Sequence, residues 1–212
     1  MTVSESRSIP SRLAPVLEAL ELDQPRVVTA DSLAQLARDQ RVDIDGVHLA
    51  YELRRLGWLL GLRTKGAWEF VPGARAGRFD AGDRYIELRA AIAVDAEFQG
   101  ALAMESAAVA LGLAGRIPDR EVLWVPPDNR APKSFGNWRV IRLPVRDDGI
   151  ASVDGLPTWR AETLLGGMAR RPDGFHDWPN VGEWLARAVS QVDAESVARS
   201  LEGGPRAAWQ RA

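Results

Sequence analysis

The chain of 212 residues is long enough for one large domain or two small ones, and its 46% hydrophobic and 26% charged content is typical of a globular protein. No run of about 18 apolar residues predicts a membrane span, and the polar N-terminus lacks the apolar core of a signal peptide, so we expect a cytoplasmic protein. The absence of cysteine excludes disulfides and thiolate chemistry, and the net charge of −2 excludes binding of polyanions by bulk charge alone.

Two amphipathic segments open the chain. Residues 9–22 and residues 31–39 each place leucine and alanine or valine at helical spacing. Residues 25–29 between them favour an extended segment. Thr29 or Asp31 can cap the second helix, because a side-chain oxygen at that position can accept a free N–H of the first turn.

Residues 43–60, DIDGVHLAYELRRLGWLL, carry the strongest pattern in the chain. Asp45 is a suitable N-cap, and Gly57 ends the predicted helix because glycine readily adopts the left-handed conformation beyond a C-terminus. Apolar residues at helical spacing form one stripe, namely Val47, Leu49, Ala50, Leu53 and Leu56. The other face carries His48, Tyr51, Glu52, Arg54 and Arg55.

Residues 60–63 and 67–71 predict two short strands, joined by Thr64-Lys65-Gly66 with glycine where a positive φ is expected. Residues 40–44 form the turn between the second and third helices. The order helix, turn, helix and two-stranded wing is typical of a winged helix-turn-helix, which places a helix in the major groove of DNA.

The polar face of the third helix and the tip of the wing supply candidate DNA contacts. Between residues 38 and 78 there are eight basic and five acidic residues, a modest positive excess. The base-edge candidates share one helical face, and they are His48, Tyr51 and Arg55. The phosphate candidates are Arg54, Arg63 and Lys65, with the hydroxyls of Thr29 and Ser32 at a helix N-terminus. Glu52 opposes DNA binding if it faces the DNA. The alternative is a protein-interaction module with solvated arginines.

Residues 72–82, rich in glycine and alanine, predict a linker that contains Arg75 and Arg78. We therefore divide the chain into a winged-helix DNA-binding domain with linker, residues 1–82, and an α+β interaction domain, residues 83–212. The predicted helices of the second domain are 85–94, 101–113, 160–170, 181–192 and 193–201. Its predicted strands are 121–126, 138–144 and 150–153, which gives an α+β protein overall.

Catalysis has little support in the sequence. The histidines, His48 and His176, have no metal-ligand spacing, and no phosphate-binding or nucleophile motif is present. A metal-dependent nuclease would place a lysine beside strand carboxylates, but Lys133 follows prolines in a loop. We expect no catalytic residue, no cofactor and no metal. Most of the eight tryptophans are predicted to be core residues, while Trp178 and Trp209, in less periodic segments, are candidate partner contacts.

Several stretches, in this order and spacing, resemble the AbiE-type antitoxins, the antitoxin half of type IV-like bacterial toxin–antitoxin pairs. They are residues 55–59 (RLGWL), 70–74 (FVPGA), 105–113 (ESAAVALGL), 125–126 (VP), 153–157 (VDGLP) and 162–165 (ETLL). The resemblance covers nearly the whole chain, and its residues are packing and turn residues rather than chemical groups.

The resemblance implies a protein that represses its own operon by binding inverted repeats in promoter DNA. It also implies a second domain that neutralises a nucleotidyltransferase-like toxin, with or without direct contact. Two alternatives remain open at this point: a winged-helix repressor whose second domain senses a ligand, and an adaptor that does not bind DNA. No membrane partner is expected.

Overall fold

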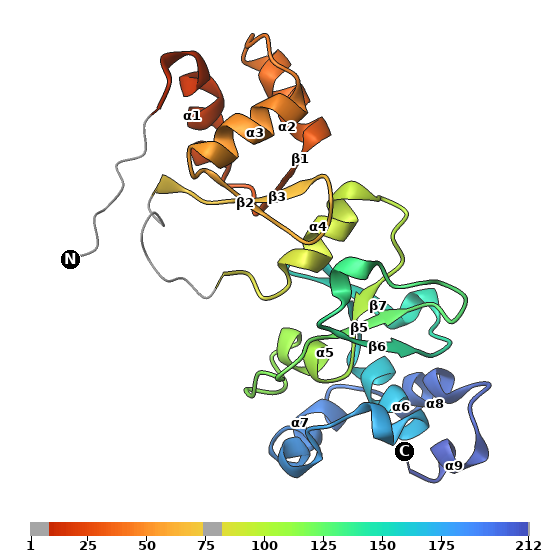
Figure 1. Cartoon of the computed structure of the whole chain (residues 1–212). Coiled ribbons are helices and arrows are strands. Elements are labelled where there is room, and N and C mark those ends of the chain that lie inside the picture. The colour runs from red at the N-terminus through yellow and green to blue at the C-terminus, as the bar shows by residue number, and fades with distance from the viewer. Residues whose placement is uncertain (1–8, 74–81, 212) are drawn as a thin grey trace. The chain divides into compact units, whose positions relative to one another are not determined.

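The computed structural model describes residues 9–73 and 82–211 (Figure 1). Its contacts divide the chain into two compact units, Met1–Phe98 and Gln99–Ala212. The sequence places the boundary after residue 82, whereas residues 83–98 pack with the first unit in the structure. Arg75 and Arg78 of the predicted linker lie outside the described residues.

The first unit has the order of elements expected of a winged helix-turn-helix. Its strands pair antiparallel in the order β1 (Val27–Thr29), β3 (Ala67–Phe70), β2 (Leu59–Gly61). Its helices are η1 (Ser11–Leu13), α1 (Ala14–Asp23), α2 (Ala30–Asp39), α3 (Gly46–Arg55) and α4 (Ile86–Val94). In Figure 1, α1, α2 and α3 gather above this sheet and α4 lies below it. The predicted helices and the two-stranded wing are thereby confirmed, with shifts of one to three residues at most ends.

The core of the first unit joins the inner faces of three helices to the sheet. Leu33 of α2 and Leu49 and Leu53 of α3 are fully buried in one cluster with Trp58 and Phe70, whose rings stack 6.4 Å apart. The prediction that Val47 belongs to this apolar stripe is wrong, since its side chain is 65% exposed. The first turn of α3 meets α2 through Gly46 instead, so the neighbouring position faces solvent.

Two carboxylates fasten α4 and the segment before it to the winged part, which explains why the boundary follows residue 98. Glu87 accepts hydrogen bonds from the backbone N–H groups of Arg63 (2.8 Å) and Thr64 (3.1 Å) in the wing turn. Asp83 accepts from Arg26 at 3.1 Å and also from Arg89. Burial disfavours the charged form of Asp83, but hydrogen bonds from Tyr85 N–H, Arg89 and Arg26 outweigh it and lower its pKa.

The second unit is built on a mixed sheet with helices, which confirms the predicted α+β class. The strand order is β6 (Arg139–Arg142), β5 (Val122–Val125), β4 (Ala101–Leu102), β8 (Leu156–Trp159), β7 (Ile150–Val153). The β5–β6 and β4–β8 pairs are parallel, and the β4–β5 and β7–β8 pairs are antiparallel. The helices are α5 (Met104–Ala110), α6 (Ala161–Arg170), α7 (Leu185–Val189), α8 (Ala194–Leu201) and α9 (Arg206–Trp209). Short 3₁₀ turns are η3 (Lys133–Phe135), η4 (Asp147–Gly149), η5 (Pro172–Gly174) and η6 (Trp178–Glu183).

Two predicted helices of this unit need correction. Residues 101–113 are not one helix: residues 101–102 form β4 between β5 and β8, and Met104 (φ 47°) turns the chain into the shorter α5. Pairing on both sides outweighs the helix propensity of alanine. Residues 181–192 are not one helix: residues 181–183 end the 3₁₀ turn η6 and only residues 185–189 form α7, because Gly182 is a poor residue for a helix interior. The strand β8 and the helix α9 are additional to the prediction.

The close approach of α2 and α3 at Gly46 gives a test of the fold. A Cβ on Gly46 would lie 1.9 Å from the carbonyl oxygen of Ala30, a backbone atom that cannot swing aside. We expect Gly46→Ala to lower the free energy of unfolding of the first unit by about 1–3 kcal/mol, as overpacking usually does. Gly115→Ala is the matched control, since nothing lies within 4 Å of its added methyl group. Denaturant titrations followed by circular dichroism measure both, and equal stability of the two variants would contradict the packing described here.

Candidate functional site

The helix α3 begins and ends as its sequence dictates. The Asp45 carboxylate accepts the backbone N–H of His48 at 2.9 Å, so the predicted N-cap is confirmed. Gly57, at φ 79°, lets the chain leave the helix and enter β2. Arg54 and Arg55 occupy the last turn, where the helix dipole favours positive charge.

The exposed face of α3 carries the predicted base-edge candidates. Tyr51 is 65% exposed, and the side chains of His48 and Arg55 are 60% and 61% exposed. Arg54 is also exposed, and its guanidinium lies 3.5 Å from the Cβ position of Gly61 in β2. The structure therefore presents these four side chains on one helix, with Arg54 resting against the wing strand.

Glu52 lies among these side chains. Its carboxylate accepts a hydrogen bond from Arg55 at 2.9 Å and lies 3.7 Å from Arg12 of η1 and 3.9 Å from the Nε2 of His48. The hydrogen bond from Arg55, with the positive charges nearby, lowers the pKa of Glu52, and the same bond raises the pKa of Arg55. The contact of Arg12 with Glu52 is not predicted from the sequence, because no local pattern connects Arg12 to α3.

The wing tip and the start of α2 hold the remaining candidates. Arg63 and Lys65 are exposed on either side of a turn whose Gly66 has φ 82°. Thr29 caps α2: its hydroxyl accepts the N–H of Ser32 at 3.1 Å, and the Ser32 hydroxyl accepts the N–H of Thr29 at 2.8 Å. Both hydroxyls take part in this capping box, so a phosphate contact there competes with the cap.

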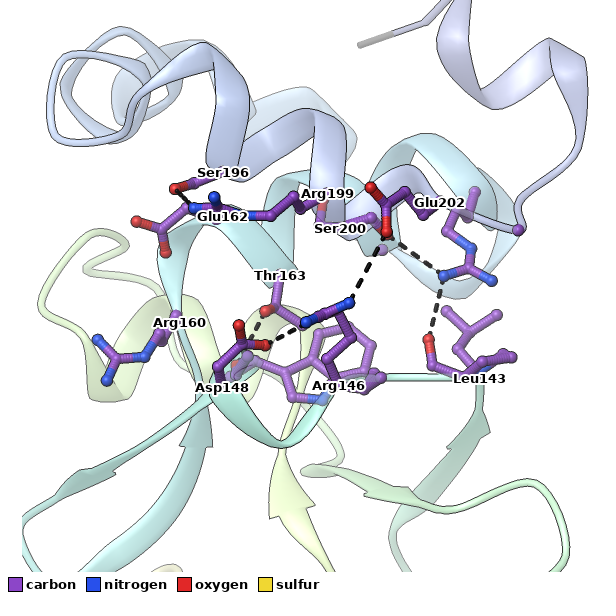
Figure 2. A pocket seen from close by; sticks show the side chains of 17 residues that line it. Leu143, Arg146, Asp148, Arg160, Glu162, Thr163, Ser196, Arg199, Ser200 and Glu202 are labelled. Carbon is purple, nitrogen blue, oxygen red and sulfur yellow. Dashed lines mark hydrogen bonds and ion pairs between the residues drawn. The ribbon is translucent and has the colours of Figure 1, made fainter.

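The second unit contains a cavity of about 640 Å³ that is lined by both charged and apolar residues (Figure 2). Its walls are α6, α8 and the segment from Leu143 to Gly149. The helices α6 and α8 come close at Gly166, where a Cβ would lie 2.0 Å from the Ser200 hydroxyl, and a Cβ on Gly167 would lie 2.6 Å from the Trp159 ring, so both glycines serve packing. None of the cavity's charged residues is among the site residues predicted from the sequence, since they come from segments far apart in the chain.

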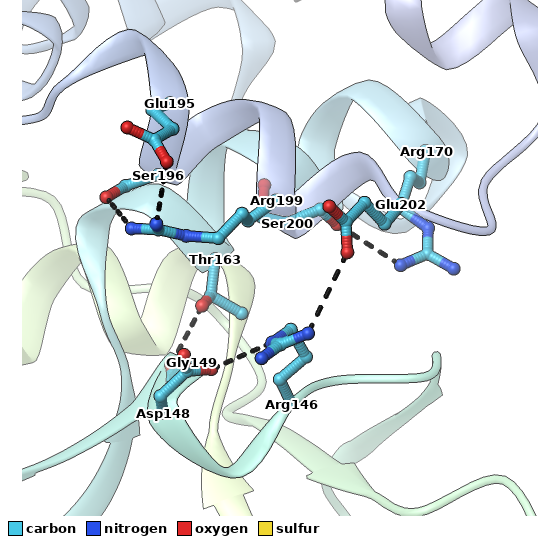
Figure 3. Close-up of polar contacts among 10 residues, drawn as sticks. All are labelled: Arg146, Asp148, Gly149, Thr163, Arg170, Glu195, Ser196, Arg199, Ser200 and Glu202. Atoms are coloured by element: carbon cyan, nitrogen blue, oxygen red, sulfur yellow. Dashed lines mark hydrogen bonds and ion pairs between the residues drawn. The ribbon is translucent and has the colours of Figure 1, made fainter.

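Ion pairs and carbonyl contacts cross this cavity (Figure 3). Arg146 lies between Asp148 at 3.2 Å and Glu202 at 3.7 Å, and so joins the η4 turn to the end of α8. Arg170 donates to the carbonyl groups of Pro144 (3.0 Å) and Ser200 (3.3 Å), and burial lowers its pKa. These bonds hold the walls together.

The two tryptophans predicted as partner contacts remain partly exposed, Trp178 at 43% and Trp209 at 50%. Trp178 donates its indole N–H to the Pro172 carbonyl at 2.9 Å and packs edge-on against Phe175. Trp58, Trp124, Trp138, Trp159 and Trp184 are buried, as expected of core residues.

In residues 9–73 and 82–211 no group of three or more His, Asp or Glu side chains is placed to hold a metal ion. Within the same ranges no helix combines the length and the apolar character needed to cross a membrane. His176 is exposed, and its backbone N–H donates to the buried carboxylate of Glu105.

Comparisons with known proteins agree with this architecture. The crystal structure of the Rv2827c protein from Mycobacterium tuberculosis is similar, with a TM-score of 0.82 and 33% sequence identity over 98% of this chain and 77% of that one. No curated protein matches the sequence. Residues 100–212 match the family described as the AbiEi antitoxin C-terminal domain. The matched region takes in nearly the whole second unit, and the likeness to Rv2827c extends over both units, so the chain belongs to the AbiEi antitoxin family.

Proposed function

We propose that this chain represses its own operon through the first unit and neutralises a cognate nucleotidyltransferase-like toxin through the second. The observation that carries the first half is the exposed cationic face of α3 beside a basic wing tip. Arg54, Arg55, Arg63 and Lys65 are all exposed on adjoining elements of one unit. Helix, wing and charge together are the features of a helix that reads the major groove.

The chemistry of each side chain suggests a division of labour. The Arg55 guanidinium suits the O6 and N7 acceptors of guanine, and His48 and Tyr51 lie within one helical turn of it. Arg54, Arg63 and Lys65 suit phosphates, which fix the register without carrying sequence information. Inverted repeats are the expected operator, because two copies of the chain would then bind equivalent half-sites.

The second half of the proposal is supported by the family match at residues 100–212. The second unit offers exposed surface for a partner, including Trp178 and Trp209. We infer direct contact with the toxin at its nucleotide site as the mode of neutralisation.

The cavity between α6 and α8 favours the ligand-sensing alternative, since about 640 Å³ is the size of many small-molecule sites.

The DNA half is tested by titrating promoter DNA against the full chain at several salt concentrations, with fluorescence anisotropy as the readout. Affinity is expected to fall steeply as salt rises. Arg55→Ala should cost about 1–3 kcal/mol on the operator and relax its sequence preference. Lys65→Ala is the comparison variant and should weaken all sequences similarly, with a salt slope smaller by about 1. If both variants bind like the unaltered chain, the surface assigned to DNA is wrong.

The toxin half is tested by separating repression from rescue in the full chain. We expect the double change Arg54→Ala, Arg55→Ala to abolish repression of a promoter–reporter fusion and to leave rescue from a co-expressed toxin intact. The reason is that both side chains lie on the exposed face of α3, outside the unit that matches the antitoxin domain. The toxin gene must be driven by an unrelated promoter, so that loss of repression does not change its dose.

Co-purification with tagged toxin then separates the modes of rescue. Rescue with co-purification supports direct contact. Rescue without co-purification removes direct contact from the proposal. If the double variant loses rescue together with DNA binding, protection works through transcription.

A further inference from the structure

Glu52 is an unexpected residue on a surface that is to bind DNA. It belongs to α3, between the base-edge candidates Tyr51 and Arg55. A carboxylate at such a place repels phosphate and lowers affinity unless cations neutralise it. The Glu52 side chain is only 13% exposed, whereas the side chains of Arg12 and Arg55 beside it are 64% and 61% exposed. The Glu52 carboxylate therefore lies beneath the exposed guanidinium groups, and DNA that approaches α3 would meet those groups first.

The geometry around Glu52 is that of a bridge between two arginines. One carboxylate oxygen, Oε2, lies 2.9 Å from the Nη2 of Arg55 and 3.7 Å from the Nη2 of Arg12. The other oxygen, Oε1, lies 3.9 Å from His48 Nε2. Arg12 comes from η1 and Arg55 from the last turn of α3, so Glu52 joins two separate elements at the same oxygen.

Such a bridge changes what Arg55 can do. An arginine side chain that is free in solvent loses rotamer entropy when a ligand fixes it, and while it is not fixed it can contact any phosphate within reach. A guanidinium has five N–H donors, and the bond to Glu52 uses one of them. The remaining donors can still form the two parallel bonds that guanine requires. The bridge also screens the two guanidinium groups from each other, so both can stay at the surface.

We propose that Glu52 is a positioning residue for sequence discrimination: it holds Arg55 ready for a base edge and brings Arg12 into the DNA-binding surface as a further phosphate contact. This inference rests on the proposed DNA binding by α3. An ion pair that only stabilises the helix at i,i+3 spacing contributes little to stability and would not change which DNA sequence is bound. A positioning role differs from it because its loss lowers discrimination even where overall affinity for DNA rises.

The test compares promoter DNA with unrelated DNA of equal length, using the full chain at one salt concentration. Glu52→Gln removes the charge at nearly constant size. Asp43→Asn is the matched control, because Asp43 is exposed just before α3 and makes no ion pair among the described residues. We expect the control to raise affinity for both DNAs by the same factor, since it only removes repulsion. We expect Glu52→Gln to raise affinity for unrelated DNA while the ratio of promoter to unrelated affinity falls by about tenfold.

Two further variants separate position from charge. Glu52→Asp keeps the charge but shortens the reach to Arg55, so the ratio should fall with no gain in affinity for unrelated DNA. In the Arg55→Ala background, Glu52→Gln should lower the ratio no further, because Glu52 acts through Arg55. Arg12→Ala should lower affinity for both DNAs alike and reduce the salt slope by about 0.9. Circular dichroism melts establish that all variants are folded.

The outcomes distinguish this inference from the proposed function. If the unaltered chain binds promoter DNA selectively and Glu52→Gln behaves like Asp43→Asn, Glu52 has no positioning role. A further fall of the ratio in the Arg55→Ala background would also overturn it, since Glu52 would then act by another route. If the unaltered chain does not bind DNA, the proposed repression by α3 fails, and the role of Glu52 falls with it.

Discussion

The first unit depends on the absence of a side chain at Gly46. A Cβ there would overlap the Ala30 carbonyl, so only glycine lets the first turn of α3 rest on α2. With the backbones this close, Leu49 and Leu53 reach the core around Leu33 and are completely buried. Because cores are packed as densely as crystals, α3 cannot rotate about its axis without opening voids. Its opposite face is therefore fixed outward, and the cations on that face owe their exposure to this one contact.

Arginine serves a different purpose in the second unit. There its side chains tie loops and helix ends together by donating to backbone carbonyl groups, as in Arg120 to Asn137, Arg139 to Gly174, Arg170 to Pro144, Arg187 to Leu113 and Arg211 to Ala169. A carbonyl accepts the guanidinium without cancelling its charge, so the hydrogen-bonding need of the loop is met where no strand pairs with it. These five arginines therefore contribute to the fold of the unit, and their number is not by itself a sign of a polyanion-binding surface.

Local chemistry in the sequence predicts much of the fold and less of the site. The caps at Thr29 and Asp45 and the turns at Gly57 and Gly66 depend on neighbours within four residues, and the structure has them where the sequence indicates. The segment at residues 101–113 misleads because its strand is decided by partners far along the chain, at β5 and β8. The cavity in the second unit and the contact of Arg12 with Glu52 likewise join distant segments. No periodicity within one segment can indicate either of them.

The net charge of −2 is compatible with binding of a polyanion because charges act over short distances in salt. At physiological ionic strength the screening length is about 8 Å, so a carboxylate several helices away contributes almost nothing at a DNA surface. Only the charges within about 8 Å of the DNA contribute, and their depth below the protein surface decides how strongly each one acts. On α3 the guanidinium and imidazole groups are outermost and the Glu52 carboxylate lies beneath them, which leaves a cationic surface on an acidic protein. The same layering limits the strength of non-specific attraction, because each bridge to Glu52 removes part of the charge that any phosphate would meet. In the proposed complex with DNA, a surface of this kind gives up affinity for DNA in general and keeps the contacts that depend on sequence.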